Sequence, residues 1–213
     1  MRQLTAHKVG AVSADLASKP AIALAVLVAQ LTQEKLGPGW ARGFGLGISM
    51  RNEALRTHAP DYDDSKAANA QDQMRQHWLG ILPTKDGQVT PEVLPWALAQ
   101  DQQILLDLLA YCIAGTVQGI QTQDTKHATP LDALATTAET DIADWWAPTG
   151  ESFLAHVSKG MITQVVTEGV GADAALALGA MKKGAAVEAA EKALAGSRWL
   201  PEPMRIKLAS QAE

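Results

Sequence analysis

The sequence has little cysteine, few aromatic residues and no long apolar run. Its one cysteine, Cys112, excludes an intramolecular disulfide and fits a reducing compartment. Aromatic residues make up 5% of the chain. The longest apolar run, at 21–29, is well short of the roughly 18 residues that a membrane-spanning helix needs. The amino-terminal MRQLTAHK lacks the apolar core of a secretion signal, so we expect a cytoplasmic protein without a membrane partner.

An excess of basic residues is also missing, because the formal net charge is −5. Residues 1–56 carry seven Lys/Arg against three Asp/Glu, a net charge of +4. Residues 57–155 carry four against fourteen, a net charge of −10, and residues 156–213 carry seven against six. A dedicated nucleic-acid-binding domain usually has a concentrated basic face. Any DNA contact is therefore expected only near the ends of the chain.

Alternating strand patterns are essentially absent, and the abundant alanine favours helix. The most apolar long helix is expected at about 101–121. Its wide buried face would contain Ile104, Leu105, Leu108, Leu109, Cys112, Ile113, Thr116, Val117 and Ile120. Later helices are expected at about 130–137, 140–147, 150–157, 159–169, 173–180, 183–195 and 201–209. We predict an all-α fold, a compact domain of about ten helices around the 101–121 helix. It would span 1–213 as a single domain; the alternative separates a small C-terminal helical subdomain from about 158.

Two adjacent tryptophans, Trp145 and Trp146, are followed closely by Pro148, which cannot continue a helix. We expect one indole ring to face the core and the other to face the adjoining helix. The three residues are thus interpreted as a structural corner. The alternative is a base-stacking platform of the kind that single-strand-binding proteins use. Acidic residues surround the pair and disfavour that alternative, namely Asp141, Asp144 and Glu151.

Residues with catalytic or metal-binding chemistry do not form a recognisable site. No serine or cysteine nucleophile has an adjacent general base that the sequence can pair with it, which disfavours a hydrolase or nuclease. A metal cluster can be drawn from His58, Asp61, Asp63, Asp64 and His77. The aspartates are expected instead to form the cap and first turn of the helix that carries His77, several turns away. We therefore predict no enzyme, no catalytic residue, no metal and no cofactor.

Five segments of the chain carry a family resemblance. They are LTAHK (4–8), APDYDDSKAA (59–68), QDQQILLDLLAYCIAGTV (100–117), DIADWWAPTGESFLAHVSK (141–159) and MKKGAAVEAAEKALAGSRWLPEPMR (181–205). In this order they resemble the C-terminal region of ParB-like proteins, the plasmid and chromosome partition or DNA-binding proteins of proteobacteria. In that family a ParB domain, which is a nucleotide-binding clamp in many members, and a helix-turn-helix domain precede this region. This chain has no arginine-rich phosphate motif and no recognisable helix-turn-helix, so those functions do not carry over.

The resemblance implies a non-catalytic module that assists DNA association or self-association, at the nucleoid or a plasmid in a bacterial cytoplasm. Its partners would be DNA, bound weakly and non-specifically, a second copy in a homodimer, or other parts of a ParB-like protein. The alternative is a protein–protein interaction or dimerisation domain with no DNA contact. Residues 182–207 have a local net charge of +3; a solvated helix face is the competing interpretation of that charge. The candidate phosphate-contacting residues are Lys159, Lys182, Lys183, Arg198, Arg205 and Lys207.

Overall fold

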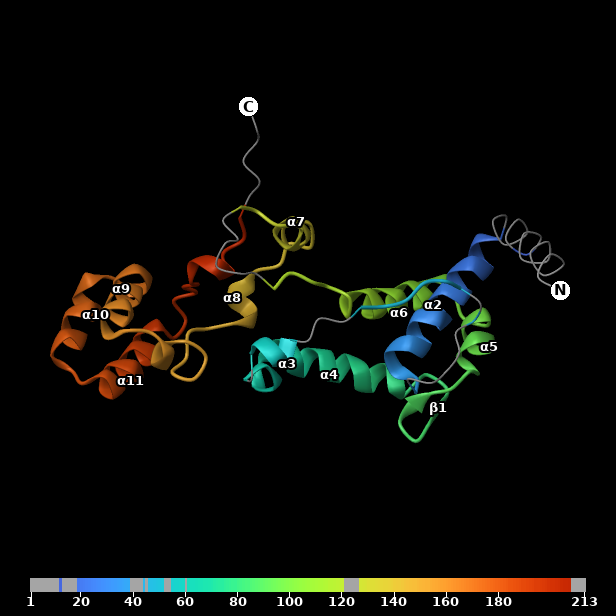
Figure 1. Ribbon diagram of the computed structural model, residues 1–213, viewed down its shortest axis with the longest axis horizontal. Coiled ribbons are helices and arrows are strands. Elements are labelled where there is room, and N and C mark those ends of the chain that lie inside the picture. The colour runs from blue at the N-terminus through green and yellow to red at the C-terminus, as the bar shows by residue number, and fades with distance from the viewer. Residues whose placement is uncertain are drawn as a thin grey trace, which may run out of the picture. The chain divides into compact units, whose positions relative to one another are not determined.

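The computed structural model describes residues 12, 19–38, 44, 46–51, 55–59, 61–120 and 127–207. These residues are mostly helical, which confirms the all-α prediction. The chain divides into two compact units, the first formed by 1–53 and 71–118 and the second by 54–70 and 119–213 (Figure 1). The single domain over 1–213 stays a prediction. The boundary of the alternative C-terminal subdomain, at about 158, falls inside the second unit. Within the described part of the chain, no helix is long and apolar enough to cross a membrane.

The first unit is built around α2, which packs against α5 and α6. Its elements are α2 (Pro20–Leu36), most of α4 (Lys66–Leu79), β1 (Thr84–Lys85), β2 (Gln88–Val89), α5 (Val93–Leu98) and α6 (Gln102–Ala114). Proline is favourable at the first helical position, where its missing N–H has no partner to lose, and Pro20 begins α2 in this way. Buried residues of α2 include Val28 and Ala29, and they pack with Leu105 and Leu108 of α6 in one apolar core.

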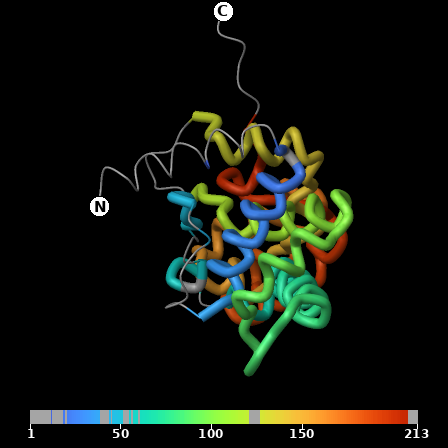
Figure 2. Tube along the Cα trace, turned by 90° about the vertical axis from the view of Figure 1, so that its right-hand side faces the viewer, coloured from blue at the N-terminus to red at the C-terminus, as the bar shows by residue number. Residues whose placement is uncertain are grey.

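A short antiparallel hairpin, β1–β2, is the exception to the helical fold, and it projects beyond the helices of its unit (Figure 1, Figure 2). Its turn residues Asp86 and Gly87 both have positive φ, at 52° and 74°. Asp-Gly is a favoured pair for such a turn, because its twist matches that of the strands. Val89 is fully buried and anchors the hairpin on the core. No strand was expected here from the sequence, although Asp-Gly is a turn signal.

Helix α6 ends at Ala114, earlier than the expected 121, and Gly115 is its C-cap. Lys35 of α2 contacts the C-terminal end of α6. Its Nζ donates to the Tyr111 carbonyl oxygen at 2.6 Å and lies 3.9 Å from the centre of the Tyr111 ring. A cation is favourable at a helix C-terminus, where carbonyls lack intrahelical partners. A Cβ atom at position 115 would lie 2.5 Å from the Lys35 Nζ, so a larger residue there would displace the end of the lysine side chain.

The predicted buried face of α6 is only partly correct. Leu105, Leu108 and Cys112 are buried, with relative exposures of 4%, 0% and 0%. Ile113, in contrast, is 51% exposed. The predicted face also extended past the end of the helix to Val117 and Ile120, and both of these are exposed as well. The helix packs on α2 through one side, and its second apolar side has no equivalent neighbour in the described part of the unit.

In the second unit, α9 packs against α10 and α11. The unit contains α3 (Leu55–His58), η1 (Tyr62–Asp64), α7 (Pro130–Thr137), α8 (Ile142–Trp145), η2 (Leu154–His156), α9 (Lys159–Val170), α10 (Ala172–Leu176), η3 (Ala177–Ala180), α11 (Lys183–Leu194) and η4 (Glu202–Met204). The core lies between the helices and includes Leu154, Ile162, Val166 and Leu194. Ser158 caps α9 by accepting a hydrogen bond from the Met161 N–H at 3.2 Å.

Helices α7, α9 and α11 match the expected ranges to within a residue or so. The helix expected at 150–157 is reduced to the single turn η2, and side-chain hydrogen bonds form a local turn before it. The Thr149 hydroxyl accepts from the Ser152 N–H at 3.0 Å, and the Ser152 hydroxyl donates to the Ala147 carbonyl at 3.3 Å. The helix expected at 201–209 is reduced to η4, although positions 208 and 209 lie outside the described residues.

Candidate nucleic-acid interface

The tryptophan pair has one inward and one outward ring. Trp146 is partly buried, and its ring meets Phe153 edge-on at 6.2 Å between centres. Phe153 in turn contacts Trp199 at 5.7 Å. Trp145 is 45% exposed, and Pro148 is buried. The chain therefore turns here around an aromatic cluster formed by Trp146, Phe153 and Trp199.

Arg198, a predicted DNA contact, is held by the acidic residues beside this corner. Its guanidinium donates to Asp141 and to Asp144, with the Asp144 bond at 2.8 Å. These hydrogen bonds raise the pKa of Arg198, with the Asp144 bond contributing most. Asp141 also caps α8 through the Ala143 N–H at 3.0 Å. Arg198 is thus neutralised within the protein and is not available as an unpaired phosphate contact.

Arg205 and Lys207 are also engaged by acidic groups. Arg205 forms an ion pair with Glu168 at 3.4 Å, and its Nε donates to the Leu200 carbonyl at 2.8 Å. Lys207 pairs with Glu202 at 2.9 Å. Exposed pairs of this kind contribute little to stability. They nevertheless reduce the positive potential at this end of the predicted interface.

The remaining three candidates lie where α9 and α11 begin. We call these residues, Lys159, Lys182 and Lys183, the lysine end. The Lys159 Nζ donates to the Gly179 carbonyl at 2.7 Å, and the Lys183 Nζ donates to the Ala155 carbonyl at 2.8 Å. These two bonds run in opposite directions between segments 155–159 and 179–183 and hold them together. Among the described residues, no carboxylate forms an ion pair with the lysine end.

The start of α11 carries positive charge where helices usually carry negative charge. Lys182 occupies the N-cap without a side-chain cap, and the first turn contains no acidic residue. The N–H groups of a first helical turn lack intrahelical partners and favour an anion. Lys182 and Lys183 are both exposed. Their charges and the helix end are therefore compatible with an anionic partner.

Three carboxylates of this unit have a lowered pKa because they accept hydrogen bonds. Thr129 donates to Asp132 from its hydroxyl at 2.7 Å, and Lys207 donates from its backbone N–H at 3.1 Å; together they lower the pKa of Asp132. The pKa of Asp141 is lowered chiefly by Arg198. The pKa of Glu168 is lowered chiefly by the Gln164 amide, followed by the Trp199 indole.

These shifts predict that acid destabilises the second unit. A carboxylate with a lowered folded-state pKa stabilises the fold above its unfolded-state pKa, which is about 3.9 for Asp and 4.3 for Glu. That contribution is lost as the pH falls through these values toward the folded-state pKa. Denaturant titrations should show lower unfolding free energy at pH 3 than at pH 7, with a smaller difference in Asp132→Asn. Equal stability at the two pH values would contradict the account.

The aspartates expected to form the first turn of the His77 helix lie before it. They belong to η1 or precede it, whereas α4 begins at Lys66, after Ser65. The Ser65 hydroxyl accepts the Ala68 N–H at 3.1 Å and takes the capping role. In the part of the chain that the structure describes, no group of three or more His, Cys, Asp and Glu side chains is placed to hold a metal ion. Cys112 is buried against Thr32, and burial raises the pKa of its thiol.

The hydrogen-bond acceptors that distinguish the six basic candidates from one another were not predicted from the sequence. Neither the carbonyls that accept from Lys159 and Lys183 nor the carboxylates that bind Arg198 are neighbours in sequence. Nor was the hollow predicted that brings Glu139 and Asp141 beside residues 200–206. No periodic pattern marks such contacts. The signal that was available is the excess of acidic residues just before the basic end.

The chain is similar over nearly its whole length to two bacterial proteins. It is 28% identical over 207 residues to "Uncharacterized protein YubM" of Escherichia coli strain K12, covering 94% of this chain and 31% of that protein. It is 29% identical over 210 residues to the protein of the same name from Escherichia coli O157:H7, with the same shares covered. The chain thus spans about a third of the length of the curated relatives it matches. No family model matches the sequence. No solved structure matches it.

Proposed function

We propose that this chain is a non-catalytic C-terminal helical module of a ParB-like DNA-binding or partition protein, which assists DNA association or self-association. The observation that carries the proposal is the lysine end, where three exposed or partly exposed ammonium groups lie on two segments that hold each other. The setting would be the nucleoid or a plasmid in a bacterial cytoplasm. The similarity to a longer Escherichia coli protein is compatible with a module of a larger chain.

The lysine end suits phosphate contacts rather than base recognition. An ammonium group has three donors, and Lys159 and Lys183 each use one of them on a backbone carbonyl. Two donors on each remain for phosphate oxygens, while the carbonyl bonds restrict where the side chains point. Lysine acts on phosphate as a point charge and carries no sequence information in that role. The proposed binding is therefore independent of DNA sequence.

The proposed binding is also weak, since only three of the six basic candidates lack a carboxylate partner. Each neutralised phosphate contributes about −0.9 to the slope of log affinity against log salt. A gel-shift titration with a short mixed-sequence duplex should give a slope of about −3 or shallower. The affinity at physiological salt should be no better than the roughly 10⁻⁴–10⁻⁶ M of non-specific binding. A much steeper slope would mean that Arg198, Arg205 or Lys207 leaves its acidic partner to bind DNA.

A second candidate function, a protein–protein interaction domain without DNA contact, is favoured by the exposed side of α6. Leu106 is 41% exposed and Ile113 is 51% exposed, in a helix whose other side forms the core. A hollow of about 400 Å³ adjoins Ile113 and is lined by Leu27, Leu31 and residues 48–51. Contiguous exposed apolar surface is typical of interaction sites.

Light scattering on the same samples separates the two candidates. A mass that rises with concentration and falls back in Ile113→Gln, together with no DNA shift even at low salt, would place the interaction domain first. A DNA shift that Ile113→Gln leaves unchanged would support the DNA-associating module. The change at position 113 is mild for folding because the side chain it replaces is half exposed.

A further inference from the structure

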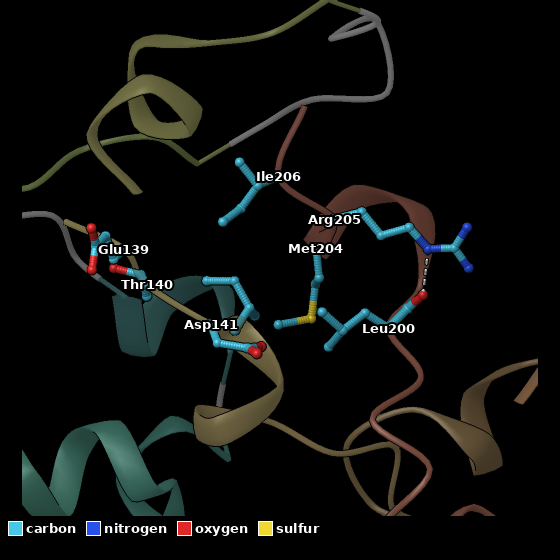
Figure 3. A pocket seen from close by; sticks show the side chains of 8 residues that line it. Glu139, Thr140, Asp141, Leu200, Met204, Arg205 and Ile206 are labelled. Carbon is cyan, nitrogen blue, oxygen red and sulfur yellow. Dashed lines mark hydrogen bonds between the residues drawn. The ribbon is translucent and has the colours of Figure 1, made fainter. Parts of the chain in front are cut away.

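A hollow of about 360 Å³ lies in the second unit between the end of α7, the start of α8 and the segment 200–206 (Figure 3). Its volume is within the range of small-molecule sites. Leu200, Met204 and Ile206 extend into this space from the C-terminal segment, opposite Glu139 and Thr140 (Figure 3). The hollow therefore has one apolar side and one polar side.

The segments around the hollow are fixed by hydrogen bonds. The backbone N–H of Lys207 donates to Asp132 at 3.1 Å, so the segment 200–206 is attached to the start of α7. At the other end of α7, the Thr140 N–H donates to the Ala135 carbonyl at 2.9 Å and closes the helix. Asp141 is held by Arg198 and caps α8. These bonds belong to the fold itself, so the hollow is formed without a ligand.

The polar side of the hollow is negative. Among the described residues, no hydrogen bond or ion pair engages the Glu139 carboxylate. Glu139 directly follows the C-terminal end of α7, where partial negative charge accumulates, and the last turn of α7 has no basic residue. Arg205 is the basic residue lining the hollow, and its guanidinium is directed away from it, toward Leu200 and Glu168 (Figure 3). The exposed Glu139 carboxylate is therefore left without a cation, whereas Asp141 is paired with Arg198.

We propose that this hollow binds an aliphatic cation, that is, an amine or guanidinium group on an apolar chain. The apolar chain would lie against Leu200, Met204 and Ile206, and the cation would lie beside the Glu139 carboxylate. An anion of the same shape would be repelled by the Glu139 carboxylate, whereas the charge of Asp141 is compensated by Arg198. This site is separate from the lysine end in its residues and opposite in charge. It therefore stands or fails independently of the proposed DNA association.

Methyl-labelled methionine provides the test, because Met204 lines the hollow while Met161 and Met181 lie elsewhere in the same unit. Hexylamine should shift the Met204 methyl resonance saturably and leave the two other methyl resonances in place. Hexanoate, of equal length and opposite charge, should give no saturable shift. Two further probes identify the source of the cation. Tighter binding of spermidine would indicate a free polyamine. Tighter binding of the peptide acetyl-Leu-Lys-Leu-amide would indicate a lysine side chain of a partner.

Variants at Glu139 separate binding from folding. Glu139→Gln should weaken hexylamine binding at least threefold, whereas Glu151→Gln, the same charge change at an exposed residue away from the hollow, should not. Glu139 has a φ of 53°, which glycine adopts without strain. Glu139→Gly should therefore raise the thermal midpoint and still weaken binding. An equal Met204 shift with hexanoate, or equal affinity of the two glutamine variants, would overturn the proposal.

Discussion

Trp146→Ala is expected to lower the unfolding free energy of the second unit by about 2–3 kcal/mol, whereas Trp145→Ala should lower it by less than about 1 kcal/mol. Trp146 is partly buried and meets Phe153 edge-on, and Phe153 continues the contact to Trp199. Truncating Trp146 removes this aromatic contact. Trp145 is 45% exposed and loses less apolar contact on truncation.

Denaturant titrations of the two single variants measure this difference. The intrinsic tryptophan signal changes in each variant, so helical circular dichroism is the suitable probe. The expected cost for Trp146 is below the 3–5 kcal/mol typical of fully buried aromatic residues, because its ring is only partly buried. Equal losses in the two variants, or a larger loss for Trp145, would show that the inward ring has been misassigned.

The helices were the part of the fold that local sequence determines most directly. Helix α7 begins at Pro130, the start expected from the sequence, and Thr129 caps it through its side chain. Pro148 likewise ends the helical stretch after the tryptophans. These features depend on residues within one turn of each other. A single sequence is sufficient to recognise them.

Several of the errors concern contacts between distant segments, unlike the overlooked Asp-Gly turn, which is local. The exposed side of α6 also carries large apolar residues, Leu106 and Ile113, so the pattern alone assigned Ile113 to the core. The early end of α6 depends on Lys35, which is 76 residues away from the Tyr111 carbonyl that it binds. The candidate site shows the same limit. Composition identified six basic residues but not that Arg198 is paired with carboxylates more than 50 positions earlier.

If the lysine end contacts DNA, reversing a charge within it should weaken DNA binding strongly. Lys182 is exposed at the N-cap of α11, and no side-chain bond fixes it to the fold. Lys182→Glu places a negative charge beside the positive end of the helix, which is favourable for folding. It also removes one of three proposed phosphate contacts and adds repulsion. We expect DNA affinity to fall about tenfold at about 50 mM salt, where phosphate contacts have their largest effect.

The most direct test compares Lys182→Glu with Lys192→Glu in a gel-shift titration on the same duplex. Both residues are exposed on α11 or at its cap, and each reversal changes the formal net charge from −5 to −7. They are ten residues apart, about 15 Å along the helix. The account predicts the tenfold loss for Lys182→Glu and less than about a twofold loss for Lys192→Glu, with both variants folded by circular dichroism. Equal losses in the two variants, or no measurable DNA shift of the parent chain at low salt, would contradict the assignment of DNA association to the lysine end.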